Sequence, residues 1–149
     1  MDLATPLPLQ TEHAELHATL GKAVKEPGVV GDAAREVARL LHPHLVREEE
    51  FALPPLALLA EVARRGVSAD MAEVLPMTRR LKAELPAMLE EHAQIVDALR
   101  KLRSAASAAG LPEYEKFADA LVLHAQTEEA VLYPASVLLG EVVESKLPP

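Results

Sequence analysis

The chain has 149 residues, a formal net charge of -8 at pH 7 and no cysteine. The length suits a single domain. The acidic balance argues against a nucleic-acid partner and against an anionic membrane surface, since both attract basic faces. The missing cysteine excludes disulfides, thiolate metal sites and cysteine nucleophiles. We find no signal-peptide pattern and no apolar stretch of the roughly 18 residues that span a bilayer, so a cytoplasmic location is expected.

The apolar residues recur at spacings of three and four, a pattern that predicts helices and no strands. The first helix is expected over about residues 6–25 and ends before the breaker Pro27-Gly28. The second is expected to start near Asp32 and to run towards Arg64, with a kink or bulge at Pro43. The fold class is therefore all-α.

The second half of the chain predicts two further helices. Pro54-Pro55 is expected to kink or break the second helix again before the third covers about residues 69–107. Gly110 is expected to end that segment, and a fourth helix is expected from Pro112 to about Leu139. Residues 1–139 are thus expected to form one domain, with residues 140–149 as a loose tail.

Each of the four apolar stripes carries a histidine where a bundle core needs an apolar residue, and two stripes also carry a glutamate. These residues are His13, His44, Glu48, His92, His124 and Glu128. Burying unpaired polar or charged groups costs several kcal/mol each. A shared metal centre is the interpretation that satisfies all six together.

The pattern occurs twice along the chain. Glu12-His13 matches Glu91-His92 at an offset of 79 residues, and the segment His44-x-x-x-Glu48-Glu49 matches His124-x-x-x-Glu128-Glu129 at an offset of 80. Pro54 matches Pro134 at the same offset of 80. The repeat predicts an up-and-down antiparallel four-helix bundle built from two helical hairpins related by a pseudo-twofold axis.

The chemistry of the six side chains favours a two-ion site with room for an added ligand. Residues i and i+4 share a helix face, so the histidine and glutamate of each motif can ligate one centre. Four imidazoles and two bridging carboxylates provide eight bonds, whereas two octahedral ions need about twelve. A shared oxide or hydroxide supplies two more, which leaves about two positions open, unlike a closed structural zinc site. The ligand set suits iron, zinc or manganese, and protonation of the histidines should weaken binding below about pH 6.5.

Several neighbouring residues are secondary candidates. His17 lies four residues after His13 and is a possible additional ligand, whereas His42 is expected to face solvent. Tyr133 is expected to cap the core near the bundle end, with a supporting role at the site as the alternative. Four carboxylates next to the motifs are expected to be mainly solvated, and orientation of a ligand imidazole is their alternative role. They are Glu12, Glu49, Glu91 and Glu129.

Taken together, these motifs resemble the hemerythrin family, specifically its bacterial HHE cation-binding branch, over about residues 8–139. The resemblance implies a non-heme di-iron centre with an oxo or hydroxo bridge, in which Glu48 and Glu128 bridge the irons. The oxygen-carrier branch has a fifth histidine at the position of Met88, and it has an aspartate five residues after its histidine where this chain has Glu128. The chain is also similar to the metal domain of iron–sulfur-cluster repair proteins, without their cysteine-bearing domain.

Three functions follow as hypotheses. The first is a binding protein that takes oxygen, nitric oxide or a related small ligand for sensing, storage or scavenging. The second is an enzyme or repair factor that acts on peroxide or donates iron to damaged centres. The third is a metal-homeostasis sensor. The histidine-rich site carries less negative charge than a carboxylate-rich oxygenase site, which favours ligand binding over turnover. The sequence indicates no particular protein partner.

Overall fold

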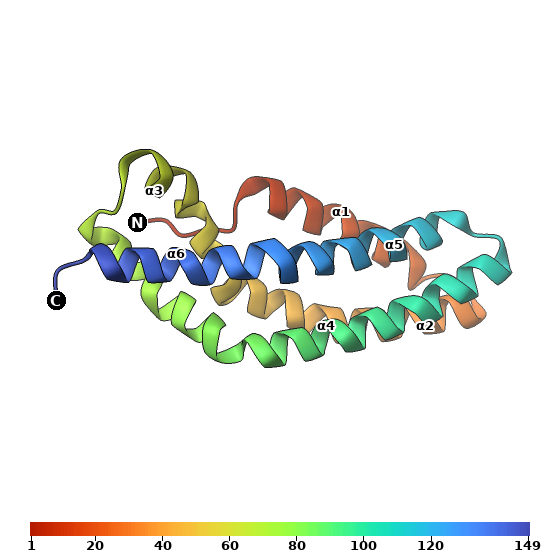
Figure 1. The fold of residues 1–149 in the computed structure, drawn as a ribbon. Helices are drawn as coiled ribbons and strands as arrows, with labels where there is room; N and C mark the ends of the chain where they lie inside the picture. The colour runs from red at the N-terminus through yellow and green to blue at the C-terminus, as the bar shows by residue number, and fades with distance from the viewer.

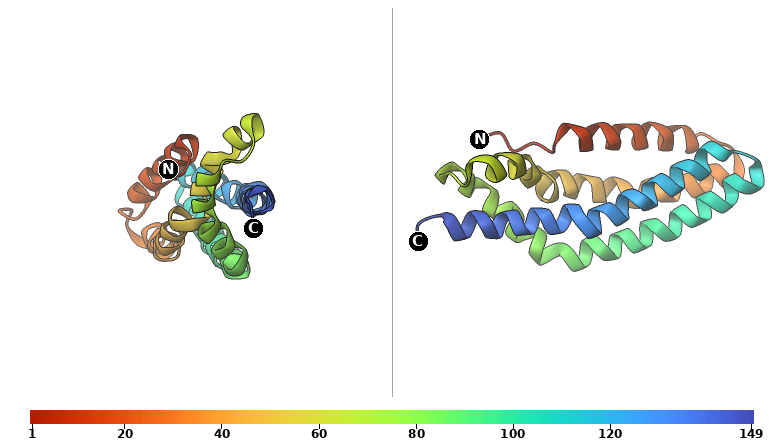
Figure 2. Two further views of the ribbon diagram at one scale, coloured as in Figure 1. Left: turned by 90° about the vertical axis from the view of Figure 1, so that its left-hand side faces the viewer. Right: turned by 45° about the horizontal axis from the view of Figure 1, so that its top comes forward.

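The computed structural model describes residues 1–149, and the chain folds as an up-and-down antiparallel four-helix bundle (Figures 1 and 2). The bundle consists of four long helical segments, or rods. The first is α1 (Leu7–Ala23), and the second is α2 (Gly28–Arg47) continued by the π-helical turn η1 (Glu48–Ala52). The third rod is α4 (Leu75–Ala109). The fourth comprises α5 (Pro112–Thr127), the π-helical turn η4 (Glu128–Leu132) and α6 (Tyr133–Lys146). The predicted fold class is confirmed.

The connection between the second and third rods folds over one end of the bundle, where both termini also lie (Figure 1). It comprises the 3₁₀ turn η2 (Pro54–Leu58), the short helix α3 (Leu59–Arg65) and the 3₁₀ turn η3 (Ala69–Val74). Gly110 has a φ of 69°, the left-handed conformation that glycine adopts without strain, and it ends α4 as predicted.

Some predicted boundaries are wrong. The second helix begins at Gly28 and not at Asp32. Pro43 lies inside this helix, as expected. The tail expected from residue 140 is helical as far as Lys146. The physical reason is burial: Gly140 packs against the Thr78 side chain, and Val143 packs in an apolar cluster with Met71 and Val74.

Both π-helical turns begin at a glutamate predicted to bind metal. The Leu53 N–H donates to the Glu48 carbonyl at 2.9 Å, and the Tyr133 N–H donates to the Glu128 carbonyl. Each bond spans five residues, so each turn holds one residue more than α-helical spacing allows. A proline follows each turn, at Pro54 and Pro134, and has no N–H to continue the α-helical ladder. The repeat in the sequence is therefore also a repeat of backbone distortion.

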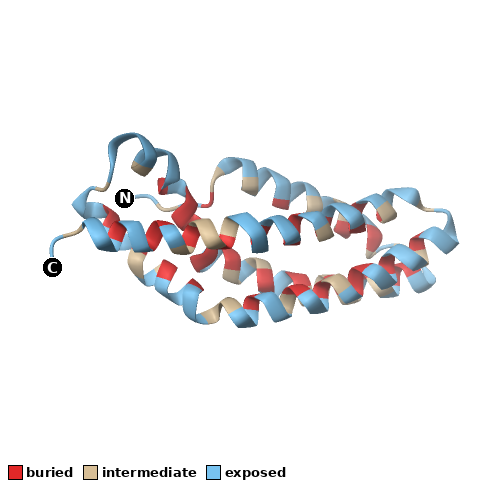
Figure 3. Cartoon of the chain, viewed as in Figure 1, coloured by how far each residue is buried: buried red, intermediate tan, exposed pale blue.

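The buried residues line the inner faces of the rods (Figure 3) and form separate apolar clusters. One cluster includes Leu20, Val37, Leu99 and Leu121. A second contains Phe51, Leu81, Met88 and Tyr133, together with Ala52, Leu53 and Leu56. The predicted ligands belong to neither cluster, and they form a buried polar layer in an otherwise apolar core. No helix is both long and apolar enough to cross a membrane.

Candidate metal centre

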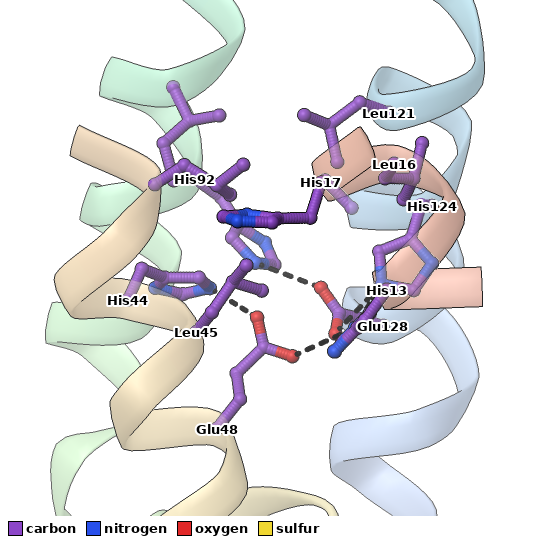
Figure 4. Close-up of a pocket in the computed structure, with 13 residues that line it drawn as sticks. His13, Leu16, His17, His44, Leu45, Glu48, His92, Leu121, His124 and Glu128 are labelled. Atoms are coloured by element: carbon purple, nitrogen blue, oxygen red, sulfur yellow. Dashed lines mark hydrogen bonds and ion pairs between the residues drawn. The ribbon is translucent and has the colours of Figure 1, made fainter. Parts of the chain in front are cut away.

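The structure brings together all six residues predicted as ligands, and all six are buried (Figure 4). They form two groups of four possible ligands, and Glu48 and Glu128 belong to both groups. One group adds His13 of α1 and His124 of α5, and the other adds His44 of α2 and His92 of α4. The two glutamates thus lie between two pairs of imidazoles.

The inner nitrogen of each imidazole faces these carboxylates. The Nε2 atom of His44 lies 2.8 Å from Oε1 of Glu48, and that of His92 lies 3.3 Å from Oε1 of Glu128. On the other side, Nε2 of His124 lies 3.2 Å from Oε2 of Glu128. The Nε2 atom of His13 lies 3.1 Å from that of His124 and 4.0 Å from Oε2 of Glu48.

Three carboxylates outside the centre bind the outer nitrogens, Nδ1, of three of the imidazoles. The pairs are His44 with Glu91 at 2.6 Å, His92 with Glu129 at 2.9 Å, and His124 with Glu12. An ionised carboxylate only accepts hydrogen bonds, so in each pair Nδ1 carries the proton and Nε2 presents a lone pair to the centre. This is the ligand tautomer, held by outer carboxylates as in other histidine metal sites.

The arrangement of these side chains is that of a cation site and not that of a polar core without bound ions. Three lone-pair nitrogens and two carboxylates point into one buried space, and Oε2 of Glu48 has no hydrogen-bond donor. Negative and lone-pair-bearing atoms at such distances repel one another unless a positive charge lies between them. Metal ions would supply that charge, and imidazole with carboxylate suits iron, manganese or zinc.

Protonation of the two glutamates reflects the same crowding. Burial and the neighbouring Glu128 raise the pKa of Glu48 well above its usual range. Burial also opposes the charge on Glu128, but its interactions with Glu48, His124 and His92 outweigh burial and lower its pKa. These opposite directions favour the neutral form of Glu48 and the charged form of Glu128 in the absence of metal, and bound cations would favour the charged form of both.

Tyr133 lies at the site, the alternative that the sequence left open for it beside a place in the core near the bundle end. Its side chain is fully buried, and its hydroxyl lies 3.2 Å from Nε2 of His44 and 3.1 Å from Nε2 of His92. Burial and the charges of the two glutamates raise its pKa, so the hydroxyl stays protonated and is available to donate. Tyr133 packs in the same cluster as Met88, where the oxygen carriers have their fifth histidine. A phenol thus approaches one pair of imidazoles from that side, and no phenol contacts the other pair.

On the opposite side, the six residues line a cavity of about 20 Å³, enough for one water-sized molecule. Its other lining residues are apolar except for His17, whose imidazole extends from α1 towards the centre in Figure 4. His17 is exposed and belongs to neither group of possible ligands, so the structure does not place it as an additional ligand. His42 faces solvent, as predicted.

The fold and this buried cluster of histidine and glutamate fit a metal-binding four-helix bundle. Residues 8–136 match the family model of the hemerythrin HHE cation binding domain, and the chain therefore belongs to the hemerythrin family. No curated protein and no solved structure matches the chain.

Proposed function

We propose that the chain holds two iron ions between Glu48 and Glu128 and binds a small diatomic ligand, oxygen or nitric oxide, beside them. The observation that carries this proposal is that two groups of four possible ligands share both glutamates. When bound, the iron pair would supply an electron-rich position for a diatomic ligand. The protein would hold the ions with His13 and His124 on one side and His44 and His92 on the other.

The cavity supports a small, weakly polar ligand. Apart from the six proposed ligands and His17, it is lined by Leu16, Leu41, Leu45, Ile95, Leu121 and Ala125. A space of about 20 Å³ beside these apolar side chains suits a diatomic gas better than an organic substrate. The histidine-rich ligand set also carries only two carboxylates, which favours reversible binding over oxidation of a substrate.

The metal content tests the first half of the proposal. The protein is stripped of metal, reconstituted with ferrous iron under anaerobic conditions and analysed for iron, and its absorption spectrum is recorded after exposure to air. We expect two irons per chain and the near-ultraviolet bands of an oxide-bridged ferric pair. Tight binding of a single zinc, or no stoichiometric iron, would restrict the conclusion to the family and the fold.

A matched pair of variants tests the role of the bridging carboxylates. The E48Q/E128Q double variant removes both, whereas E49Q/E129Q changes the next residue in each motif and leaves the bridging positions intact. We expect the first to lose stoichiometric iron and the second to retain two irons with weaker binding. Equal iron content in both double variants would contradict bridging by Glu48 and Glu128.

The cavity can be tested separately from the metal. Ala125 lines it and is not a proposed ligand, so A125L would fill the space while keeping all six ligand residues, whereas A87L places the same side chain on the exposed face of α4. We expect A125L to retain iron but to bind nitric oxide more weakly, with A87L unchanged. Steady peroxide consumption by the reconstituted wild type would instead support the enzyme hypothesis.

A further inference from the structure

A surface groove between α1 and α2 continues outward from the central cavity. It has a volume of about 600 Å³ and is lined by residues from the start of the chain, from α1 and from the second rod. The groove and the cavity share three lining residues, His13, His17 and Leu45. These three side chains therefore face both the groove and the cavity beside the proposed ion positions.

The groove is lined by both histidines that are not proposed ligands of the centre. The chain has six histidines, and the two outside the candidate centre, His17 and His42, come from different helices and both line the groove. Glu49 lines it as well, and all three residues are exposed. Imidazole and carboxylate are the ligand types that divalent iron, manganese and zinc accept. Donors suited to the cation thus lie outside the centre, next to one of its proposed ligands.

His13 is the proposed ligand that lines this groove, and no hydrogen bond to its outer nitrogen holds its imidazole in place. Nδ1 of His13 is buried and has no hydrogen-bond partner, whereas the other three ligand imidazoles are bound by carboxylates. In the repeat, the pair His92 and Glu129 corresponds to His13 and Glu49. Glu49 lines the same groove as His13 but does not bond to it. Glu49 is therefore the counterpart of the three outer carboxylates. It lies in the same groove as His13, but the hydrogen bond to Nδ1 of His13 is not formed.

The helix that carries His13 is also the least anchored of the four rods. Only His13, Leu20 and Ala23 of α1 are buried, whereas α2 buries six residues from Val30 to His44. A helix with few buried apolar residues moves at low cost in free energy. His13 can therefore swing aside and return while the ligands on the other three rods stay in place.

We propose that divalent cations load the centre through this groove, passing His42, Glu49 and His17 as single donors along its wall, and that Glu49 then bonds to Nδ1 of His13 to close the site. The three residues do not form a joint ligand group of their own. This inference rests on the proposed two-ion function. A second groove between α4 and α5 also reaches a proposed ligand, His92. Nδ1 of His92 is already bound there by Glu129, so that groove has no proposed ligand whose outer nitrogen is free.

The test is the rate of metal uptake by the metal-free protein. Cobalt(II) or ferrous iron under anaerobic conditions is mixed rapidly with wild type and with H17Q/H42Q, and the absorption of the ligated ion is followed. Both histidines are exposed, so the double variant is expected to fold. We expect uptake to slow by about tenfold, the lower end of the effect of local cation capture on association rates, while two ions still bind at equilibrium.

Two further variants separate capture from overall charge and from closing. E49Q and D97N each remove one negative charge, the first from the α1–α2 groove and the second from the α4–α5 groove. We expect E49Q to slow uptake and to speed zinc release to a chelator by about tenfold, as loss of an outer carboxylate does, and D97N to change neither.

Three outcomes would overturn the loading route: an unchanged uptake rate in H17Q/H42Q, equal slowing in D97N, or unchanged zinc release in E49Q. If H17Q/H42Q instead failed to bind two ions at equilibrium, these histidines would be ligands or structural residues, which also contradicts the proposal. A wild type that never binds two ions would refute the proposed function itself, so the two failures are distinguishable.

Discussion

Replacement of Glu91 tests whether the outer carboxylates prepare the ligands. Its Oε2 atom lies 2.6 Å from Nδ1 of His44, and the same carboxylate pairs with Arg47. Loss of such an outer partner typically lowers metal affinity by about 10- to 100-fold, or about 1.4–2.7 kcal/mol. Glutamine keeps an oxygen that accepts from Nδ1 but loses the charge, so we expect about tenfold weaker binding for E91Q. Alanine removes both, so E91A should lie near 100-fold.

The assay is competition between the protein and a chelator for zinc, with binding of the first and second ion fitted separately. E90Q is the matched control because Glu90 is exposed and belongs to no pair near the centre. We expect the loss to fall mainly on one of the two ions, since Glu91 contacts His44 and no other proposed ligand. Affinities for E91A within about twofold of E90Q would show that Glu91 is only the partner of Arg47, because the loss expected from removing an outer ligand is far larger.

Three further predictions follow from the packing and the electrostatics. Y133F should leave the affinity of the iron-loaded protein for nitric oxide unchanged, because Tyr133 does not line the cavity. The test is a titration of the variant with nitric oxide, and a sharp fall in affinity would contradict the prediction. A Cβ added at Gly140 would overlap the Thr78 side chain, so G140A should lower the free energy of unfolding, measured in urea, by about 1–3 kcal/mol. G21A is the control: no atom lies near the added carbon, so it should not lower the free energy of unfolding. Burial lowers the pKa of His44 from 6.5 to about 4 in the metal-free protein, so between these values the unfolded chain binds a proton that the folded chain does not. The resulting stability is complete above pH 6.5 and is lost as the pH falls through about 4, and wild type should lose up to about 3 kcal/mol more than H44Q over this range.

The six proposed ligands were accessible to sequence reasoning because helices are regular. Side chains four residues apart on a helix lie on one face wherever the helix sits in the fold. His44 with Glu48, and His124 with Glu128, therefore point to one centre before the packing is known. The repeat offsets of 79 and 80 residues then place His13 and His92 at similar depth.

Contacts between rods were less accessible because they depend on rotation and on local distortion. The partners of the outer nitrogens, Glu12, Glu91 and Glu129, are all adjacent to a ligand, but each contacts a histidine of a different rod. The sequence shows such residues as polar neighbours and does not distinguish a solvated carboxylate from an orienting one. The signal that would have found them is the repeat itself, since all three occupy repeated positions.

The position of Tyr133 depended on a backbone feature that composition does not show. Regular α-helical spacing puts residue i+5 about 140° round the helix from residue i, away from the face of Glu128. The π-helical turn adds one residue between them and brings the phenol beside the imidazoles. Proline at position 134 was recognised as part of the repeat, but a kink or bulge was expected at Pro43 and a kink or break at Pro54-Pro55, and no distortion was expected before Pro134.

The departures from twofold symmetry make the two proposed ion positions unequal. Tyr133 has Leu53 as its counterpart in the repeat, so a phenol approaches only the pair His44 and His92. The pair His13 and His124 has no phenol, and His13 lacks the outer carboxylate that holds its counterpart. The side without a phenol is also the side on which the α1–α2 groove reaches His13. In the proposed two-ion centre, ligation would therefore be shared between two similar hairpins, whereas exchange with solvent would take place next to His13, along the groove of the first hairpin.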